Sequence, residues 1–183
     1  MEITLIQTDD EQFMRQALNQ ARLALEAGEF PVGCVLVREN KVIQRGRRCN
    51  SEGRESNEID HAEMVTLRAL LAEQPGIDCR GITVYSTMEP CLMCYTTLLL
   101  SGVHRFVWAY EDIMGGGTNL PLQQLAPLYR DMQNQVELVP NILRQESLRL
   151  FGQFFQNSSY WQDSLLAEYT LAEYQQSIST SRH

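Results

Sequence analysis

The order of segments along the sequence predicts an α/β domain with helices on both faces of a sheet. Short segments rich in β-branched and aromatic residues alternate with longer segments whose apolar residues recur at helical spacing. Hydrophobic residues make up 44% of the chain and charged residues 21%, a composition that can bury a core. A chain of 183 residues is expected to form one compact domain.

The first part of the chain is expected to fold as a helix, a pair of strands and a second helix. Residues 9–27 predict an amphipathic helix that ends at Gly28. A buried strand at residues 34–37 turns back through residues 38–41 into a second strand. A largely apolar helix then occupies residues 61–72.

A polar surface loop is expected between the second strand and this helix, at residues 46–60. Arginines gather in and beside the loop: Arg45, Arg47, Arg48 and Arg54. Such a basic cluster is either a solvated face or a site that attracts phosphate, and the sequence leaves both readings open.

Strands and helices continue to alternate in the second part of the chain. The predicted strands cover residues 82–86, 105–110 and 136–139. The predicted helices cover residues 91–100, 122–129 and 141–155, with one more in the tail at 158–183. Gly115-Gly116-Gly117 predicts a flexible loop.

Two short motifs predict a catalytic zinc site: His61-Ala62-Glu63 and Pro90-Cys91-Leu92-Met93-Cys94. One His and two Cys supply three protein ligands and leave the fourth tetrahedral position open for water. A structural zinc site is normally closed by a fourth protein ligand. His-x-Glu followed by Pro-Cys-x-x-Cys is the signature of zinc-dependent nucleobase deaminases.

The predicted positions of these motifs suit this chemistry. Cys91 and Cys94 fall at a helix start, where free N–H groups and the helix dipole favour thiolates, and their spacing puts both on one face. Zinc lowers the pKa of a bound water to about 7. Glu63 is expected to be the catalytic residue that carries protons from this water to the ring and the departing amine, and not a zinc ligand.

Two other readings of the motifs remain open. His104 is a possible fourth ligand of a closed structural zinc site, but Glu63 then has no role. A deaminase-fold subunit without activity is the second reading, and the presence of Glu63 argues against it.

At these motifs the sequence resembles the cytidine deaminase superfamily, especially the branch of tRNA adenosine deaminases, guanine deaminases and fungal-type cytosine deaminases. The likeness covers roughly residues 10–155 and is carried by residues 29–37, 61–63 and 89–94. It implies a three-layer α/β/α fold with a five-stranded mixed sheet, zinc on His61, Cys91 and Cys94, and homodimers. Residues 1–157 then form the deaminase domain, and residues 158–183 form a helical tail that acts as a lid or a dimer arm.

The resemblance also marks candidate substrate contacts. The family commonly has a Gly-x-Asn at the end of the second strand, whose Asn holds the substrate. Gly46 and Asn50 are further apart here, and Asn50 is the best match. Asp60 contacts the substrate or caps the following helix. Glu111 and Asp112 accept hydrogen bonds from a base or lie in a solvated turn. The remaining candidates are Glu89, within its motif, and the aromatic residues Phe30 and Trp108, of which Trp108 is alternatively a core residue.

Charge favours a small substrate over nucleic acid. The formal net charge is −8 and the pI about 4.9, whereas nucleic-acid binding usually leaves a basic footprint. The tail carries Asp163, Glu168 and Glu173 against Arg182. We therefore expect a free base or nucleoside of guanine, cytosine or adenine type, with tRNA adenosine and then a nucleotide as the alternatives.

The chain is expected to be a cytoplasmic protein without membrane contact. It begins without a basic, then apolar, leader, and no apolar run reaches the length of a membrane span. Its five cysteines, an odd number, favour a reducing compartment over a disulfide framework.

Overall fold

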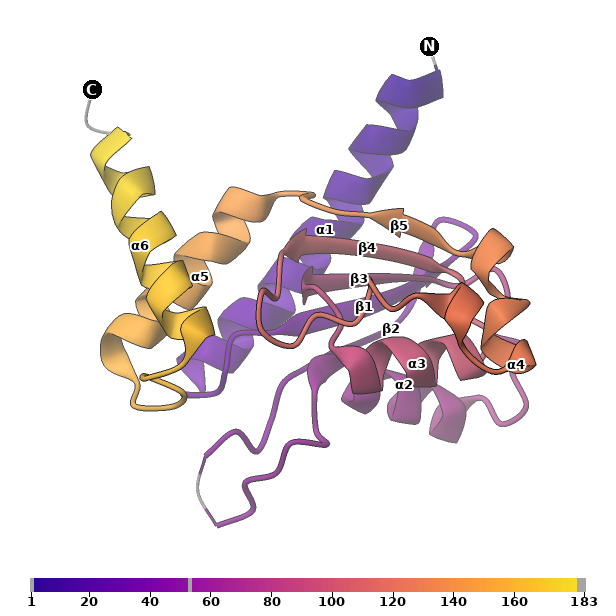
Figure 1. Ribbon diagram of the computed structural model, residues 1–183, viewed down its shortest axis with the longest axis horizontal. Coiled ribbons are helices and arrows are strands. Elements are labelled where there is room, and N and C mark those ends of the chain that lie inside the picture. The colour runs from indigo at the N-terminus through magenta and orange to yellow at the C-terminus, as the bar shows by residue number, and fades with distance from the viewer. Residues whose placement is uncertain (1, 53, 181–183) are drawn as a thin grey trace.

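The computed structural model describes residues 2–52 and 54–180, which fold around a five-stranded sheet with the order β2-β1-β3-β4-β5 (Figure 1). The strands are β1 Gly33–Arg38, β2 Lys41–Arg47, β3 Thr83–Met88, β4 Arg105–Tyr110 and β5 Glu137–Val139. β1 is antiparallel to both β2 and β3, whereas β3, β4 and β5 are mutually parallel. The predicted α/β class and mixed five-stranded sheet are therefore confirmed.

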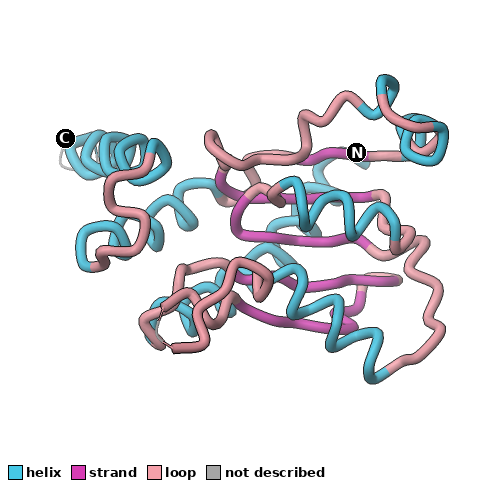
Figure 2. The backbone as a smooth tube through the Cα atoms, turned by 60° about the horizontal axis from the view of Figure 1, so that its bottom comes forward, coloured by secondary structure: helices cyan, strands magenta, loops and turns pink. Residues whose placement is uncertain are grey.

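Helices cover both faces of this sheet. They are α1 Glu2–Glu26, α2 Ala62–Glu73, α3 Leu92–Leu100, α4 Pro127–Arg130, α5 Arg144–Asn157 and α6 Leu165–Thr180, with short 3-10 turns η1 Leu122–Gln124 and η2 Gln133–Gln135. α2 and α3 lie together on one face and α1 on the other (Figure 1). In the turned view of Figure 2, two helices cross in front of the strands while the C-terminal helix stands at one end of the sheet. No helix in the described part of the chain is long and apolar enough to cross a membrane.

Strand alternation explains the layers, because successive side chains point to opposite faces of a sheet. Val35, Tyr85 and Val107 are buried in one hydrophobic cluster with the apolar face of α1. Leu36 and Phe106 are buried in the other cluster, with the apolar residues of α2 and α3. Two cores thus hold the sheet between its helix layers.

α1 extends further towards the N-terminus than the predicted helix, which began at residue 9. Asp10 lies within α1, and its carboxylate accepts hydrogen bonds from the Tyr85 hydroxyl at 2.7 Å and from both terminal nitrogens of Arg105 at 2.9 Å. A buried carboxylate needs such partners to offset its loss of hydration. The contact fixes α1 across β3 and β4.

α6 packs on α5 beside the carboxyl end of β4. Arg144 at the start of α5 binds the carboxylates of Glu111 and Glu173, and the Tyr169 hydroxyl donates to Glu111 at 2.7 Å. Burial alone would raise the pKa of Glu111, but the hydrogen bonds from Arg144 and Tyr169 outweigh it and lower that pKa. Gly152 makes close packing possible, because a Cβ there would overlap the Tyr174 ring.

Replacing Glu111 by Gln is expected to lower the free energy of unfolding by about 2 kcal/mol at pH 7, because a charge-assisted, partly buried contact is lost. The lowered pKa means that the wild-type advantage is fully present above the ordinary glutamate pKa of about 4.3. It should shrink as the pH falls below that value and the carboxylate protonates. Urea unfolding at pH 7 and pH 3.5 measures this difference in the free energy of unfolding.

The matched control is Glu168→Gln, at an exposed position of α6, which should change the free energy of unfolding little at either pH. An equal loss at both pH values for Glu111→Gln would contradict the role given to the Glu111 carboxylate.

Candidate metal and substrate site

The starts of α2 and α3 bring the predicted zinc ligands together. His61 is the N-cap residue of α2, and Cys91 is the N-cap residue of α3, with Cys94 in the first turn of α3. The His61 Nδ1 atom lies 3.5 Å from the Cys91 sulfur and 3.6 Å from the Cys94 sulfur. All three donor atoms lie within 4.8 Å of one another.

These separations fit a tetrahedral zinc ion. Zinc bonds of about 2.3 Å to sulfur and about 2.0 Å to nitrogen at tetrahedral angles place the two donors about 3.5 Å apart. Within residues 2–52 and 54–180 the cluster contains His61, Cys91 and Cys94, and His104 is not part of it. The fourth coordination position is therefore open to a small molecule, as a catalytic zinc site requires.

The pKa values of the two ligand thiols are shifted in opposite directions. Hydrogen bonding with Cys94 and His61 lowers the pKa of Cys91, whereas hydrogen bonding with Cys91 and burial raise the pKa of Cys94. Zinc binds thiolates, so metal uptake displaces the proton of a thiol that is still protonated. Bound here, zinc supplies a coordinated water whose pKa is lowered to about 7.

Glu63 lies beside the ligand cluster and does not belong to it. Its carboxyl is 3% exposed, lies 3.6 Å from the Cys94 sulfur, and accepts a hydrogen bond of 2.8 Å from the Ser86 hydroxyl. Burial raises the pKa of Glu63, and a carboxyl with a raised pKa exchanges protons more readily near neutral pH. The Ser86 hydroxyl donates to Oε1 of Glu63, and the Cys94 thiol donates to Oε2, so Oε2 is the oxygen that faces the ligand cluster.

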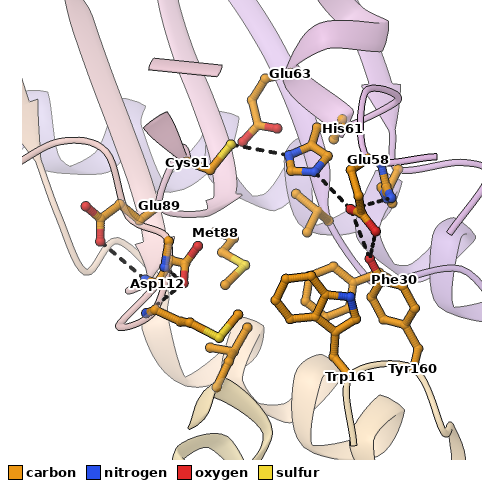
Figure 3. A pocket seen from close by; sticks show the side chains of 16 residues that line it. Phe30, Glu58, His61, Glu63, Met88, Glu89, Cys91, Asp112, Tyr160 and Trp161 are labelled. Carbon is orange, nitrogen blue, oxygen red and sulfur yellow. Dashed lines mark hydrogen bonds and ion pairs between the residues drawn. The ribbon is translucent and has the colours of Figure 1, made fainter. Parts of the chain in front are cut away.

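A cavity of about 140 Å³ opens directly onto this group of residues. Apolar side chains from four elements or loops form most of its wall: Phe30, Val32, Met88, Met114 and Leu166. Tyr160 and Trp161, from the segment before α6, lie across the cavity from Cys91 (Figure 3). A small, mostly apolar space beside a reactive centre suits a flat heterocycle.

Comparison with known proteins identifies the family. The family model described as "Cytidine and deoxycytidylate deaminase zinc-binding region" matches residues 7–110. The tRNA-specific adenosine deaminase of Bacillus subtilis (strain 168) is 34% identical over 150 residues, which are 81% of this chain and 89% of that protein. The chain belongs to this deaminase family.

Solved structures agree with this assignment. A structure from a study of A-to-I editing by tRNA:A34 deaminases superposes with a TM-score of 0.62 at 25% identity, covering 76% of this chain and 98% of that one. Guanine deaminase from Nitrosomonas europaea superposes with a TM-score of 0.61 at 18% identity, covering 79% of this chain and 83% of that one, which shows the shared fold. The chain is thus a zinc-dependent deaminase that hydrolyses the C–N bond of an amine on a nucleobase.

The loop after β4 is fixed against the metal motif of the deaminase and does not have the freedom expected of Gly115-Gly116-Gly117. Glu89 accepts hydrogen bonds from the backbone N–H of Asp112 and Thr118 and from the Thr118 hydroxyl. The Gly117 N–H donates to the Pro90 carbonyl at 2.9 Å. A Cβ on Gly117 would lie 2.7 Å from the Leu92 backbone. Gly117 therefore allows the loop to approach the start of α3 closely.

The structure divides the predicted substrate contacts into two groups. Phe30, Glu89 and Asp112 line the cavity, and their contact with substrate stays a prediction. The other candidates lie outside its lining: Asn50, Asp60, Trp108 and Glu111. Trp108 is 6% exposed and packs in the core, which was its alternative reading. Arg144 and Tyr169 donate hydrogen bonds to the carboxylate of Glu111, so this carboxylate binds other protein groups and not the cavity.

Asn50 and Asp60 contact each other outside the lining of the cavity, and their contact with substrate stays a prediction. The Asn50 amide donates to Asp60 at 2.8 Å, the Asn57 amide donates to it at 2.9 Å, and Arg68 binds its other oxygen. Hydrogen bonds from Asn57, Asn50 and Arg68 lower the pKa of Asp60 to about 2. His61 and not Asp60 is the N-cap residue of α2. Asp60 therefore organises the loop before the metal ligand.

Sequence reasoning missed several cavity residues: Arg48, Glu58, Met114, Tyr160 and Trp161. One usable signal existed for Arg48. Counting the family's Gly-x-Asn spacing from Gly46 leads to position 48, which is the first residue after β2. No local pattern marks Tyr160 or Trp161, because they reach the cavity through the packing of α6.

Replacing Glu63 by Ala should leave zinc content unchanged and lower ammonia release from the protein's nucleobase substrate by at least about 100-fold, because the proton carrier is lost. Metal analysis and an ammonia assay on the same preparation separate the two effects. Glu73→Ala, at the exposed end of the same helix, is the matched control and should keep full activity. Retention of more than a tenth of wild-type activity in Glu63→Ala would contradict the role of Glu63.

Proposed function

We propose that this deaminase converts adenosine to inosine in the anticodon loop of a tRNA. The observation that supports this most strongly is the 34% identity to the B. subtilis tRNA-specific adenosine deaminase over 81% of this chain and 89% of that protein. A likeness of this extent covers nearly the whole relative and not the zinc motifs alone. It favours tRNA over the free base or nucleoside that the acidic composition had suggested.

The cavity is compatible with a single flipped-out base. Enzymes that act on a base must take it out of its stack and enclose it in a small pocket. Phe30 and Trp161 offer aromatic faces to such a base, and the start of α2 presents Glu63 to its reacting edge. Glu63 then takes a proton from the attacking water, protonates the ring, and assists the release of ammonia.

The RNA backbone is expected to follow exposed arginines near the cavity, despite the net charge of −8. Arg45, Arg47 and Arg54 are exposed at the end of β2 and in the loop that follows. Arg48 was expected to belong to the same arginine cluster, but it is buried and is therefore not part of this surface. An overall acidic protein still binds nucleic acid where local cations gather.

The test is inosine formation in an anticodon stem-loop with adenosine at the wobble position, using the zinc-loaded protein. The same stem-loop with guanosine there is the control, beside free adenine, guanine, cytosine and their nucleosides. We expect inosine in the adenosine stem-loop alone, with affinity falling as salt rises. Turnover of a free base or nucleoside without turnover of the stem-loop would overturn the proposal.

A second candidate, a free base or nucleoside, is favoured by the tail. Tyr160 and Trp161 form part of the cavity wall, which matches a segment that closes over a small ligand. The tail beyond them is acidic at Asp163, Glu168 and Glu173, which would repel an RNA backbone. In both candidates we propose that the tail covers the cavity. Homodimer formation and a cytoplasmic location stay predictions.

Trp161→Asn tests the role of the tail. Trp161 is 44% exposed and has a φ of 53°, a left-handed conformation that Asn tolerates, so the variant removes the ring without straining the backbone. Loss of one stacking contact should raise KM about tenfold with the sedimentation coefficient unchanged. Leu165→Asn, at an exposed apolar residue of the same segment, is the control. An unchanged KM with altered sedimentation would instead indicate a dimer arm.

A further inference from the structure

Arg48 is a buried cation on the wall of the cavity with part of its guanidinium unused. It is 2% exposed and follows β2 directly. Its Nε atom donates to the Ser51 hydroxyl at 3.3 Å, and its Nη2 atom donates to the Asn57 carbonyl at 2.7 Å and to Glu58 at 3.2 Å. Its Nη1 atom is buried and has no hydrogen-bond partner in the described part of the chain.

An unused guanidinium nitrogen in the interior needs an explanation. Arginine stays charged and carries five N–H donors, and nearly all buried donors in proteins are hydrogen-bonded. The other two nitrogens hold the side chain in place, and the Arg48 N–H binds the Val32 carbonyl at 2.9 Å. Arg48 lines the ligand cavity, so a ligand bound there could supply the acceptor that the buried Nη1 atom lacks.

The charges around the cavity indicate which kind of acceptor fits. The described lining residues include the carboxyl groups Glu58, Glu63, Glu89 and Asp112, against the guanidinium of Arg48. Glu58 already neutralises Arg48 through an ion pair of 3.2 Å. A phosphate or carboxylate in this space would meet more repulsion than attraction. An uncharged acceptor, such as a ring nitrogen or a carbonyl oxygen, satisfies Nη1 without that repulsion.

We propose that Arg48 is a specificity-determining residue that donates a hydrogen bond from Nη1 to an uncharged acceptor on the base being deaminated. The inference rests on the proposed function only in that a base enters this cavity. A base that lacks the acceptor leaves Nη1 buried and unpaired, and sites built around such a donor reject such analogues strongly. Arg48 thereby selects among bases that all present an amine to the same zinc site.

The test compares binding of wobble-position analogues to zinc-loaded Glu63→Ala protein, which prevents turnover. Fluorescence anisotropy gives the Kd for the same stem-loop carrying adenosine, 1-deaza-, 3-deaza- or 7-deazaadenosine, each analogue lacking one ring acceptor. With Arg48 present, one analogue should bind about tenfold more weakly than adenosine. With Arg48→Met added, that difference should disappear. Arg47→Met removes the same charge from the exposed neighbouring position and should keep the difference.

The outcomes separate this inference from the proposed function. Equal discrimination with and without Arg48, or no discrimination among the analogues with Arg48 present, would overturn the inference while stem-loop deamination stands. If the stem-loop does not bind, the proposed function fails, and thermal shifts with free adenine, guanine and cytosine decide about Arg48. Whichever base stabilises the Arg48 protein should then bind Arg48→Met about tenfold more weakly, and equal binding overturns the inference. If Arg48→Met does not fold, Arg48→Lys serves in its place, because it keeps the positive charge and removes the planar guanidinium group with its Nη1 donor.

Discussion

The site depends on the meeting of two helix starts at one edge of the sheet. His61 and Cys91 are the N-cap residues of α2 and α3, so neither side chain is committed to a helix face and both point to the same place. The N–H groups at these starts have no partners within their helices and favour the negative charge of thiolates. β3 leads into α3 at the carboxyl end of the parallel strands, where α/β sheets usually bind ligands.

A chain of polar contacts connects this candidate metal centre with the C-terminal tail. Glu58 lies 3.6 Å from the outer nitrogen of His61, pairs with Arg48, and accepts a hydrogen bond from the Tyr160 hydroxyl at 3.2 Å (Figure 3). A carboxylate on the outer nitrogen of a ligating His fixes its tautomer and ring orientation. The same carboxylate therefore contacts the metal ligand His61, the buried Arg48 and Tyr160 of the tail.

The sequence predicts best how residues that are close together along the chain are arranged. The spacing in His61-Ala62-Glu63 and Cys91-Leu92-Met93-Cys94 sets these side chains at two helix starts, so local patterns predicted that the three metal donors meet. The strand and helix order was also predictable, because buried strands and amphipathic helices leave periodic patterns.

What the sequence could not give depends on contacts between distant segments. Tyr160 and Glu58 are 102 positions apart and meet only because α6 packs on α5. Glu111 was expected to accept hydrogen bonds from a base or to lie in a solvated turn, but Arg144, 33 positions later in the sequence, donates to its carboxylate. Asn50 is the best match to the family's substrate-holding Asn, but its amide donates to Asp60, and Arg48 lines the cavity instead. Residue type marks a candidate, and tertiary packing decides which partner it meets.

The central claim is an open three-ligand zinc centre, and X-ray absorption at the zinc edge tests it most directly. The account predicts one zinc per chain, with two sulfur donors at about 2.3 Å, one histidine nitrogen, and one further light atom at about 2.0 Å. The light atom should be replaced when a small anion such as cyanide is added. Four protein donors that resist replacement, or a third sulfur, would show a closed structural site and contradict the account.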